Sequence, residues 1–347
     1  MTQENLVVRF DDVSVIFGEK TAPALEMANQ GISRTDIQNK TGNILGVSKC
    51  TLDVHEGEII VLMGLSGSGK STLLRTVNRL NPITSGNVQI RTQGEMIDVG
   101  MASNTALRAL RQHTVTMVFQ NFALLPWRTV AENVGLGLEL AGMSPAKCKE
   151  LVDQQLEIVG LGNWGDKKIH ELSGGMQQRV GLARAFVTDA PVLLMDEPFS
   201  ALDPLIRAHL QDELLTLQER LRRTIIFVSH DLDEAVKIGT KIAIMEGGRI
   251  VQFGTPQDIV LNPADDYVGE FVAHMNPLNV LRASDVMRVL NESRQPTPSI
   301  PSVTPNTPLR SIIRQQADSI DVIEVIADGK TIGEIAAQDI MKSLVHS

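Results

Sequence analysis

The stretch Gly64-Leu-Ser-Gly-Ser-Gly-Lys-Ser71 fits the pattern G-x-x-x-x-G-K-[ST] of a phosphate-binding loop. The apolar run 58–63 before it predicts a strand, and the apolar spacing after it predicts a helix. Glycines let successive backbone N–H groups of such a loop point at phosphate oxygens, and the following helix adds its positive N-terminal end. The stretch therefore predicts a nucleotide-binding site in an α/β fold.

Three side chains at the end of this loop have individual predicted roles. Lys70 would reach the β- and γ-phosphates, Ser71 would offer its hydroxyl to Mg²⁺, and Thr72 lies beside it in the first helical turn. The predicted nucleotide-binding residues of the loop are Gly64, Leu65, Ser66, Gly67, Ser68, Gly69, Lys70, Ser71 and Thr72.

Composition limits the class of protein. The 347 residues are 43% hydrophobic, which is ordinary for a globular chain, and the net charge of -9 argues against a nucleic-acid binder. No apolar run approaches the roughly 18 residues that span a bilayer, and residues 1–5 lack the start of a signal peptide, so we expect a cytosolic chain. Cys50 and Cys148 have no metal-like spacing, which favours reduced structural thiols.

Strand and helix patterns alternate along most of the chain. The strand candidates are residues 7–17, 58–63, 115–119, 192–195, 225–229 and 241–245, with helical patterns between them. This alternation predicts a mostly parallel sheet covered by helices.

An insert at residues 21–44 separates the first two strands, and we interpret it as a helix pair. Residues 22–29 look helical and stop at Gly31. Ser33 and Asp36 predict the cap of a second short helix that ends near Gly42.

The C-terminal part has a different composition. Residues 291–308 are rich in proline, serine and threonine, which predicts an exposed loop or linker. Beyond it, residues 309–314 look helical, 322–327 extended and 335–345 helical, with a turn at Asp328-Gly329. About 40 residues is little for an independent core, so this part is expected to pair with residues 283–290 or with another chain.

Two carboxylates end the apolar strand pattern of residues 190–195. Asp196 could hold Mg²⁺ directly or through water, and Glu197 could polarise the attacking water. The alternative is a carboxylate pair that merely ends a core strand. The phosphate loop upstream favours the catalytic interpretation.

A Ser-Gly-Gly turn opens a second helix within residues 172–185, and the start of that helix could bind an anion. A chain with one phosphate loop needs no second anion site, unless Ser173, Gly174 and Gly175 close over ATP held by another subunit. The structural alternative is a serine-capped, glycine-rich helix start.

The phosphate loop, L-S-G-G-M, L-L-M-D-E-P, S-A-L-D and V-S-H-D occur in this order and resemble the nucleotide-binding subunit of an ABC transporter. The resemblance covers roughly residues 7–255. It implies an ATPase in which two cassettes meet head to tail as a homodimer and enclose two ATP molecules, each between one phosphate loop and the opposite Ser-Gly-Gly signature. ATP and Mg²⁺ are the implied ligands.

The resemblance also assigns residues by matching position. Gln120 resembles the glutamine that senses Mg²⁺ and the transmembrane partner, Asp203 the aspartate that communicates across the dimer, and His230 the histidine that contacts the γ-phosphate. Met176 departs from the commoner glutamine of the signature, which leaves the Ser-Gly-Gly backbone untouched. Phe17 is the candidate for stacking on adenine, with a place in the core as its alternative.

Large apolar side chains within residues 122–127 surround a proline just after Gln120. A buried loop is one interpretation; in a transporter subunit the segment would form the groove for a helix of the permease. We favour the groove. A peripheral position at the cytoplasmic face of the inner (plasma) membrane follows from it.

The helix pair, F-A-L-L-P-W-R-T-V and F-S-A-L-D-P-L-I-R resemble the branch of ABC importers for quaternary-ammonium osmolytes. Within it the chain is most similar to choline-uptake ATPases, with glycine betaine or proline betaine importers as the alternative. A separate permease and a periplasmic or lipid-anchored binding protein would handle the substrate. Rival classes are an ABC ATPase of DNA repair or translation, a non-enzymatic regulatory subunit, and an exporter.

Residues 283–287 and 332–340 resemble the opening and closing segments of a cystathionine-β-synthase (CBS) module. We therefore expect an ABC ATPase domain at 1–275 and a single CBS-like module at 276–347 that contains the loop 291–308. Ala336 stands where a hydroxyl often contacts nucleotide, although Asp339 is retained. Nucleotide sensing, dimerisation or docking, and a vestigial module stay open.

Overall fold

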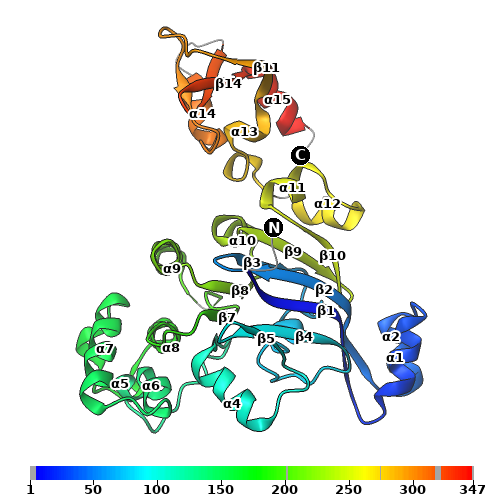
Figure 1. Cartoon of the computed structure of the whole chain (residues 1–347), viewed down its shortest axis with the longest axis vertical. Helices are drawn as coiled ribbons and strands as arrows, with labels where there is room; N and C mark the ends of the chain where they lie inside the picture. Colours follow the sequence, from blue (N-terminus) through cyan, green and yellow to red (C-terminus); the bar gives the residue numbers. More distant parts are fainter. Residues whose placement is uncertain (1–4, 201, 274, 317–321, 346–347) are drawn as a thin grey trace. The chain divides into compact units, whose positions relative to one another are not determined.

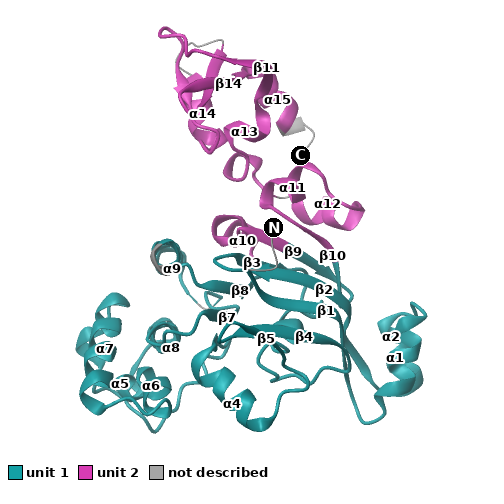
Figure 2. Ribbon diagram, in the orientation of Figure 1, with its two compact units in different colours: residues 1–230, 243–250 teal, residues 231–242, 251–347 magenta. Residues whose placement is uncertain are grey.

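The computed structural model describes residues 5–200, 202–273, 275–316 and 322–345. Figure 1 shows the course of the chain, and Figure 2 its two compact units. Unit 1 comprises residues 1–230 and 243–250, and unit 2 comprises 231–242 and 251–347. The domain boundary expected after residue 275 stays a prediction.

A six-stranded sheet of order β10-β9-β3-β8-β7-β6 carries the ends of the predicted motifs. Strand β3 pairs in parallel with β8, β8 with β7 and β7 with β6, so the carboxyl ends of these four strands lie at one edge of the sheet. Its strands are β3 (Ile59–Met63), β6 (Val115–Val118), β7 (Val192–Asp196), β8 (Thr224–Val228), β9 (Lys241–Glu246) and β10 (Arg249–Gly254).

A separate four-stranded antiparallel sheet has the order β2-β1-β4-β5. Its strands are β1 (Leu6–Phe17), β2 (Ile44–His55), β4 (Ser85–Thr92) and β5 (Glu95–Asp98). The sequence patterns predicted β1 but not this second sheet, because β4 and β5 are largely half-buried and carry polar residues. Apolar residues of both sheets share one core with α3 (Lys70–Leu74) and α4 (Asn104–His113).

A helical subdomain with its own apolar core follows β6 in the chain. It contains α5 (Val130–Val134), α6 (Leu136–Leu140), α7 (Pro145–Ile158) and α8 (Gly174–Phe186). Residues of α5, α7 and α8 form this core, among them Val130, Val152 and Val180. The chain then returns to the sheet through β7, continues into α9 (Pro204–Leu221) and, after β8, enters α10 (Leu232–Ile238).

The predicted helix pair is present as α1 (Thr21–Asn29) and α2 (Arg34–Thr41). The side chain of Ser33 accepts a hydrogen bond from the backbone N–H of Asp36, which caps α2 as the sequence predicted. Gly42 ends the helix with a φ of +70°. Ala24, Ala28 and Ile37 pack with β1 and β2 in a small core.

The C-terminal module of unit 2 is built on a sheet of order β11-β14-β13-β12. Helices α11 (Pro256–Leu261) and α12 (Asp266–Val272) precede it in the chain. The module contains α13 (Ala283–Val286), β11 (Arg288–Arg294), β12 (Ser302–Val303), α14 (Leu309–Gln316), β13 (Val322–Ala327), β14 (Lys330–Ala336) and α15 (Ala337–Val345). Residues of α13, α14, β13 and β14 share one core, which confirms the expected pairing with residues 283–290.

Two expectations for this module were wrong in part. Residues 291–308 are not wholly a loop, because β11 extends to Arg294 and β12 forms at 302–303. The helix expected at 335–345 begins only at Ala337, since residues 335 and 336 end β14. The carboxylate of Asp339 accepts hydrogen bonds from the backbone N–H of Ala336 (2.8 Å) and from Arg288 Nε (3.0 Å), so it caps α15. The likeness to a CBS module stays a prediction.

Both cysteines are free thiols, as expected. Burial raises the pKa of Cys50 to about 12, which keeps its thiol protonated and unreactive. Across the described residues, no helix combines the length and apolarity needed to cross a bilayer.

Candidate nucleotide site

The phosphate loop joins β3 to α3, the strand–loop–helix context that the sequence predicted. Lys70 lies at the start of α3, and its Nζ donates to the carbonyls of Gly64 (2.8 Å) and Leu65 (3.0 Å). Burial is the largest influence on the pKa of Lys70 and lowers it, while Glu197 and Asp196 act in the opposite direction. The ammonium group is therefore held at the loop, within the field of both carboxylates.

The backbone of this loop requires glycine. Gly64, Gly67 and Gly69 have φ values of +139°, +78° and +102°. A Cβ on Gly69 would lie 2.6 Å from the carbonyl oxygen of Gly46, so no side chain fits there. Ser68 Oγ is buried and has no hydrogen-bond partner in the described part of the chain. The loop is thus a close-packed cradle with a buried polar atom that a polar ligand would satisfy.

Asp196 lies at the end of β7 and is fully buried. Its Oδ1 accepts a 2.6 Å hydrogen bond from Ser71 Oγ. Its Oδ2 accepts from Arg75 Nε (3.1 Å) and Nη2 (2.8 Å). The structure therefore brings together Ser71 and Asp196, two of the three predicted magnesium ligands, the third being Gln120. The sequence analysis missed Arg75, although a cation one turn beyond Ser71 on the same helix face was a readable signal.

Two other residues that the sequence predicted as catalytic, Gln120 and His230, contact one carboxylate oxygen of Glu197. Gln120 Nε2 donates to Glu197 Oε2 at 3.2 Å, and His230 Nδ1 lies 3.2 Å from the same oxygen. Glu197 itself has a φ of +49°, which is rare for a residue with a side chain and stores strain. The three residues predicted as catalytic therefore form one cluster at the carboxyl ends of β6, β7 and β8.

Arg184 of α8 ties the loop after Gln120 to the helical subdomain. Its Nη2 donates to the carbonyl of Phe122 (2.6 Å) and its Nη1 to that of Ala123 (2.8 Å). Both loop residues have positive φ values, +56° for Phe122 and +46° for Ala123. We call residues 120–127 the glutamine loop.

The rest of the glutamine loop is partly exposed. Leu124 packs against the core of the helical subdomain, whereas Trp127 is 70% exposed. The interpretation as a buried loop is therefore wrong at Trp127. Docking of a permease on this segment stays a prediction.

Phe17 ends β1 next to the start of α3. A Cβ on Gly46 would lie 2.8 Å from Phe17 Cε2 and 3.0 Å from Thr72 Cγ2. The Phe17 ring and the first turn of α3 therefore both lie close to Gly46, which has no side chain. Phe17 is 37% exposed, which argues against the core alternative. Its ring therefore lies close to the first turn of the helix that follows the phosphate loop, and the residue is partly exposed.

The signature residues lie at the start of α8 in the helical subdomain, whose core is separate from the one that contains α3. Ser173 caps α8 by accepting from the backbone N–H of Met176, in the helical subdomain. Ser173 and Gly174 are exposed, and a Cβ on Gly174 would meet no atom of the described residues within 4 Å. Asp203 caps α9 by accepting from Ile206 N–H. The signature is thus open to a partner, as a site shared between subunits would require.

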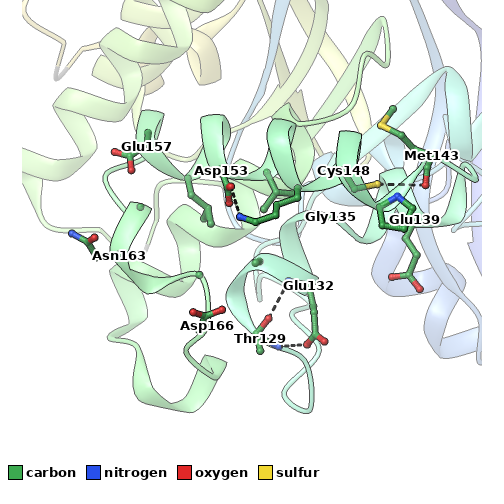
Figure 3. Close-up of a pocket in the computed structure, with 17 residues that line it drawn as sticks. Thr129, Glu132, Gly135, Glu139, Met143, Cys148, Asp153, Glu157, Asn163 and Asp166 are labelled. Carbon is green, nitrogen blue, oxygen red and sulfur yellow. Dashed lines mark hydrogen bonds and ion pairs between the residues drawn. The ribbon is translucent and has the colours of Figure 1, made fainter.

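A pocket of about 980 Å³ lies in the helical subdomain (Figure 3). Thr129 and Glu132 of the α5 capping box line it, as do Lys149 and Asp153, which form an ion pair of 2.6 Å. Among the described residues that line this pocket, none belongs to the predicted nucleotide site. The large volume of this pocket therefore does not identify the nucleotide-binding site.

The residues present suit both predicted ligands. A positive-φ glycine loop with an adjacent lysine and a helix N-terminus fits a polyphosphate. The oxygens of Ser71 and Asp196 form a hard donor pair of the kind that Mg²⁺ prefers.

This fold and site define an ATP-binding cassette that hydrolyses ATP. The family model described as ABC transporter matches residues 47–200. A dimeric post-hydrolysis structure of the ATP-binding cassette MJ0796, bound to ADP and Pi, is similar with a TM-score of 0.61 and 28% identity, covering 72% of this chain and 98% of that one.

Two curated relatives narrow the family. The glycine betaine/proline betaine transport ATP-binding protein ProV of Escherichia coli is 50% identical over 273 residues, 79% of this chain and 67% of its own. The trimethylamine N-oxide transport ATP-binding protein TmoW of Ruegeria pomeroyi is 40% identical over 343 residues, 98% of both chains. The chain belongs to the ATP-binding subunits of ABC importers for glycine betaine, proline betaine and related osmoprotectants. The expected fold class and ATPase activity are confirmed.

Proposed function

We propose that this chain drives the import of a glycine betaine-type osmoprotectant. The observation that carries the proposal is the 50% identity with a relative named for glycine betaine and proline betaine. The relatives described above are named for betaines and for trimethylamine N-oxide. Glycine betaine therefore replaces choline, which the sequence analysis placed first, as the leading candidate.

Trimethylamine N-oxide is the second candidate. The relative named for it matches 98% of this chain and 98% of its own length, so the match includes the C-terminal module. Glycine betaine and trimethylamine N-oxide are both small, N-methylated dipolar molecules. The two candidates differ in the binding protein that would select between them, because this chain need not touch the substrate.

The proposed catalytic step follows from the carboxylate cluster. Glu197 would take the proton of the water that attacks the γ-phosphate of ATP. Gln120 and His230 hold its Oε2, which fixes the direction of the carboxylate. With that oxygen occupied by two neighbours, Oε1 is the atom we assign to the water.

The proposed magnesium site uses Ser71 and Asp196, with Gln120 as a further ligand. The bound ion would neutralise charge on the β- and γ-phosphates. Asp196 is fully buried and hydrogen-bonded on both oxygens, so it is held rigidly for that task.

The complete site needs a second copy of the chain. Ser173, Gly174 and Gly175 open α8 outside the core that carries the phosphate loop, and they are exposed or half-exposed. We infer that they contact ATP bound to the partner subunit and that Asp203 lies near this junction. The similar cassette structure is dimeric, which supports the inference.

Coupling to transport would run through the permease. Trp127 exposes 70% of its surface at the end of the glutamine loop, which begins with Gln120. We propose that the permease contacts this segment and that the chain works as a peripheral subunit on the cytoplasmic side of the membrane. ATP-driven closure of the dimer would then alternate the permease between its two access states.

The deciding experiment is ATP hydrolysis by this chain reconstituted with its cognate permease and binding protein. Glycine betaine, trimethylamine N-oxide and choline are added separately at equal concentrations. We expect the largest stimulation with glycine betaine. Stimulation by trimethylamine N-oxide alone would favour the second candidate. Stimulation by choline alone would favour the choline importer that the sequence analysis placed first.

A further inference from the structure

Arg34 of the helix-pair insert contacts the phosphate loop directly. It is the first residue of α2, and its Nη1 donates to the carbonyl of Gly67 at 2.7 Å. The same guanidinium donates from Nε to the carbonyl of Leu45 (2.7 Å) and from Nη2 to that of Gly46 (3.3 Å). One side chain therefore joins α2, β2 and the phosphate loop.

Three other carbonyls of the loop accept hydrogen bonds from neighbouring residues. Lys70 Nζ donates to the carbonyls of Gly64 and Leu65, and the backbone N–H of Gly248 donates to that of Ser68 at 3.0 Å. Arg34 supplies the corresponding support for Gly67. Fixing the carbonyls on one side leaves the N–H groups of the loop turned toward the phosphates.

The charge of Arg34 strengthens this support. The side chain is half-buried, and burial lowers the pKa of its guanidinium, which nevertheless stays protonated. Hydrogen bonds from an ionised donor are roughly twice as strong as neutral ones. The cation also lies next to the place where the polyphosphate would be bound.

Arg34 also contacts the segment next to Phe17, where we expect the adenine base to bind. Gly46, whose carbonyl Arg34 holds, is the bare residue over which Phe17 and Thr72 meet. The guanidinium thus connects the backbone beneath the aromatic ring with the backbone of the phosphate loop. The relative position of these two parts decides whether base and phosphates can be bound at once.

We propose that Arg34 is a positioning residue of the ATP site, and that the helix-pair insert is thereby a working part of that site. Arg34 fixes the carbonyl of Gly67 relative to the carbonyls of Leu45 and Gly46 on β2. Loss of the guanidinium releases the Gly67 carbonyl and weakens the binding of Mg·ATP, without removing a group that takes part in the chemical step.

Three variants of the full chain test the proposal. Arg34→Ala removes the support, and Arg34→Lys keeps the charge and three N–H donors while losing the planar fork. Lys40→Ala is the matched control, because Lys40 is an exposed cation on the same helix. The measurements are the Kd for Mg·ATP by calorimetry, the KM and kcat of ATP hydrolysis in the reconstituted transporter, and the melting temperature without nucleotide.

We expect Arg34→Ala to raise Kd and KM by roughly tenfold, the loss of about one charge-assisted hydrogen bond, with kcat within about twofold of the parent. Arg34→Lys should recover a large part of the affinity, and Lys40→Ala should bind as the parent does. If both Arg34 variants bind Mg·ATP as the parent does while their melting temperatures fall, the residue only anchors the insert and the proposal is wrong. Equal losses in Arg34→Ala and Lys40→Ala would also overturn it, since they would reflect net charge.

Discussion

Ser71 and Asp196, which are 125 positions apart in the chain, are joined by a hydrogen bond of 2.6 Å from the serine hydroxyl to Oδ1 of the aspartate. The bond forms because β3 and β7 are both parallel neighbours of β8, so the loop after β3 and the end of β7 reach the same edge. The topology of the sheet thus brings the residues of the proposed magnesium site together.

Arg75→Ala should destabilise this assembly. The variant deprives the fully buried Asp196 carboxylate of both hydrogen bonds to Oδ2, which we expect to lower the free energy of unfolding by about 2 kcal/mol. Saturating Mg·ATP should reduce the stability difference between Arg75→Ala and the parent, because the ion brings a new positive charge to the Asp196 carboxylate. Thermal unfolding with and without Mg·ATP measures both effects. Arg108→Ala, an exposed cation of α4, is the control and should melt as the parent does.

Glu197→Gln should bind ATP, accumulate as a closed dimer and lose turnover by at least about 100-fold, because an amide cannot take the proton from water. The amide keeps the size of the side chain, so the cluster with Gln120 and His230 should persist. Phosphate release and size-exclusion chromatography with ATP provide the two readouts. Normal hydrolysis by this variant would end the assignment of Glu197 as the base.

Phe17→Ala should weaken ATP binding by about fivefold to 100-fold, the range for loss of stacking on a base. Phe17→Tyr keeps an aromatic face and should bind ATP about as well as the parent. Titration with ATP and with inorganic triphosphate separates base from phosphate contacts. A similar loss for triphosphate would mean that Phe17 acts through Gly46 and Thr72 and not through the base.

Glu324 in the C-terminal module should make stability depend on pH. Burial raises the pKa of this carboxyl, but hydrogen bonds from Thr297, Arg294 and Thr331 outweigh burial and lower the pKa from 4.5 to about 2. The folded state therefore binds its proton less readily than the unfolded state. The contribution of Glu324 is complete above about pH 4.5 and is lost as the pH falls toward about 2.

The comparison of the parent with Glu324→Gln isolates this group. Urea unfolding at several pH values should show the parent more stable at neutral pH, with an advantage that shrinks below about pH 4.5. A difference that stays constant down to pH 3 would contradict the role of the ionised carboxylate.

Most of the nucleotide site could be predicted from the sequence because it is carried by short motifs at strand ends. The phosphate loop and the Asp196-Glu197 pair each follow an apolar run, and such runs predict where a strand stops. The helix pair was equally readable, because Ser33 and Gly42 are chemical signals of a helix start and a helix end.

The contacts between distant segments could not be predicted in this way. Arg75 holding Asp196, and Arg184 holding the carbonyls of the glutamine loop, depend on three-dimensional packing that no local pattern records. Strand β14 was mistaken for helix at residues 335 and 336, because the apolar spacing of its last residues runs on into α15. Substrate choice lies outside the reach of these patterns, since this chain need not contact the substrate.

The hydrogen bonds from Arg184 to two successive carbonyls couple the glutamine loop to α8. The backbone at residues 122 and 123 is restrained relative to α8, because the guanidinium of Arg184 holds both carbonyl groups. We therefore expect a displacement of Phe122 and Ala123 to move α8, and with it Ser173 at the N-terminal end of that helix. In the proposed assembly, the glutamine loop and α8 would therefore transmit a displacement as one rigid unit, from the permease to the nucleotide of the neighbouring subunit.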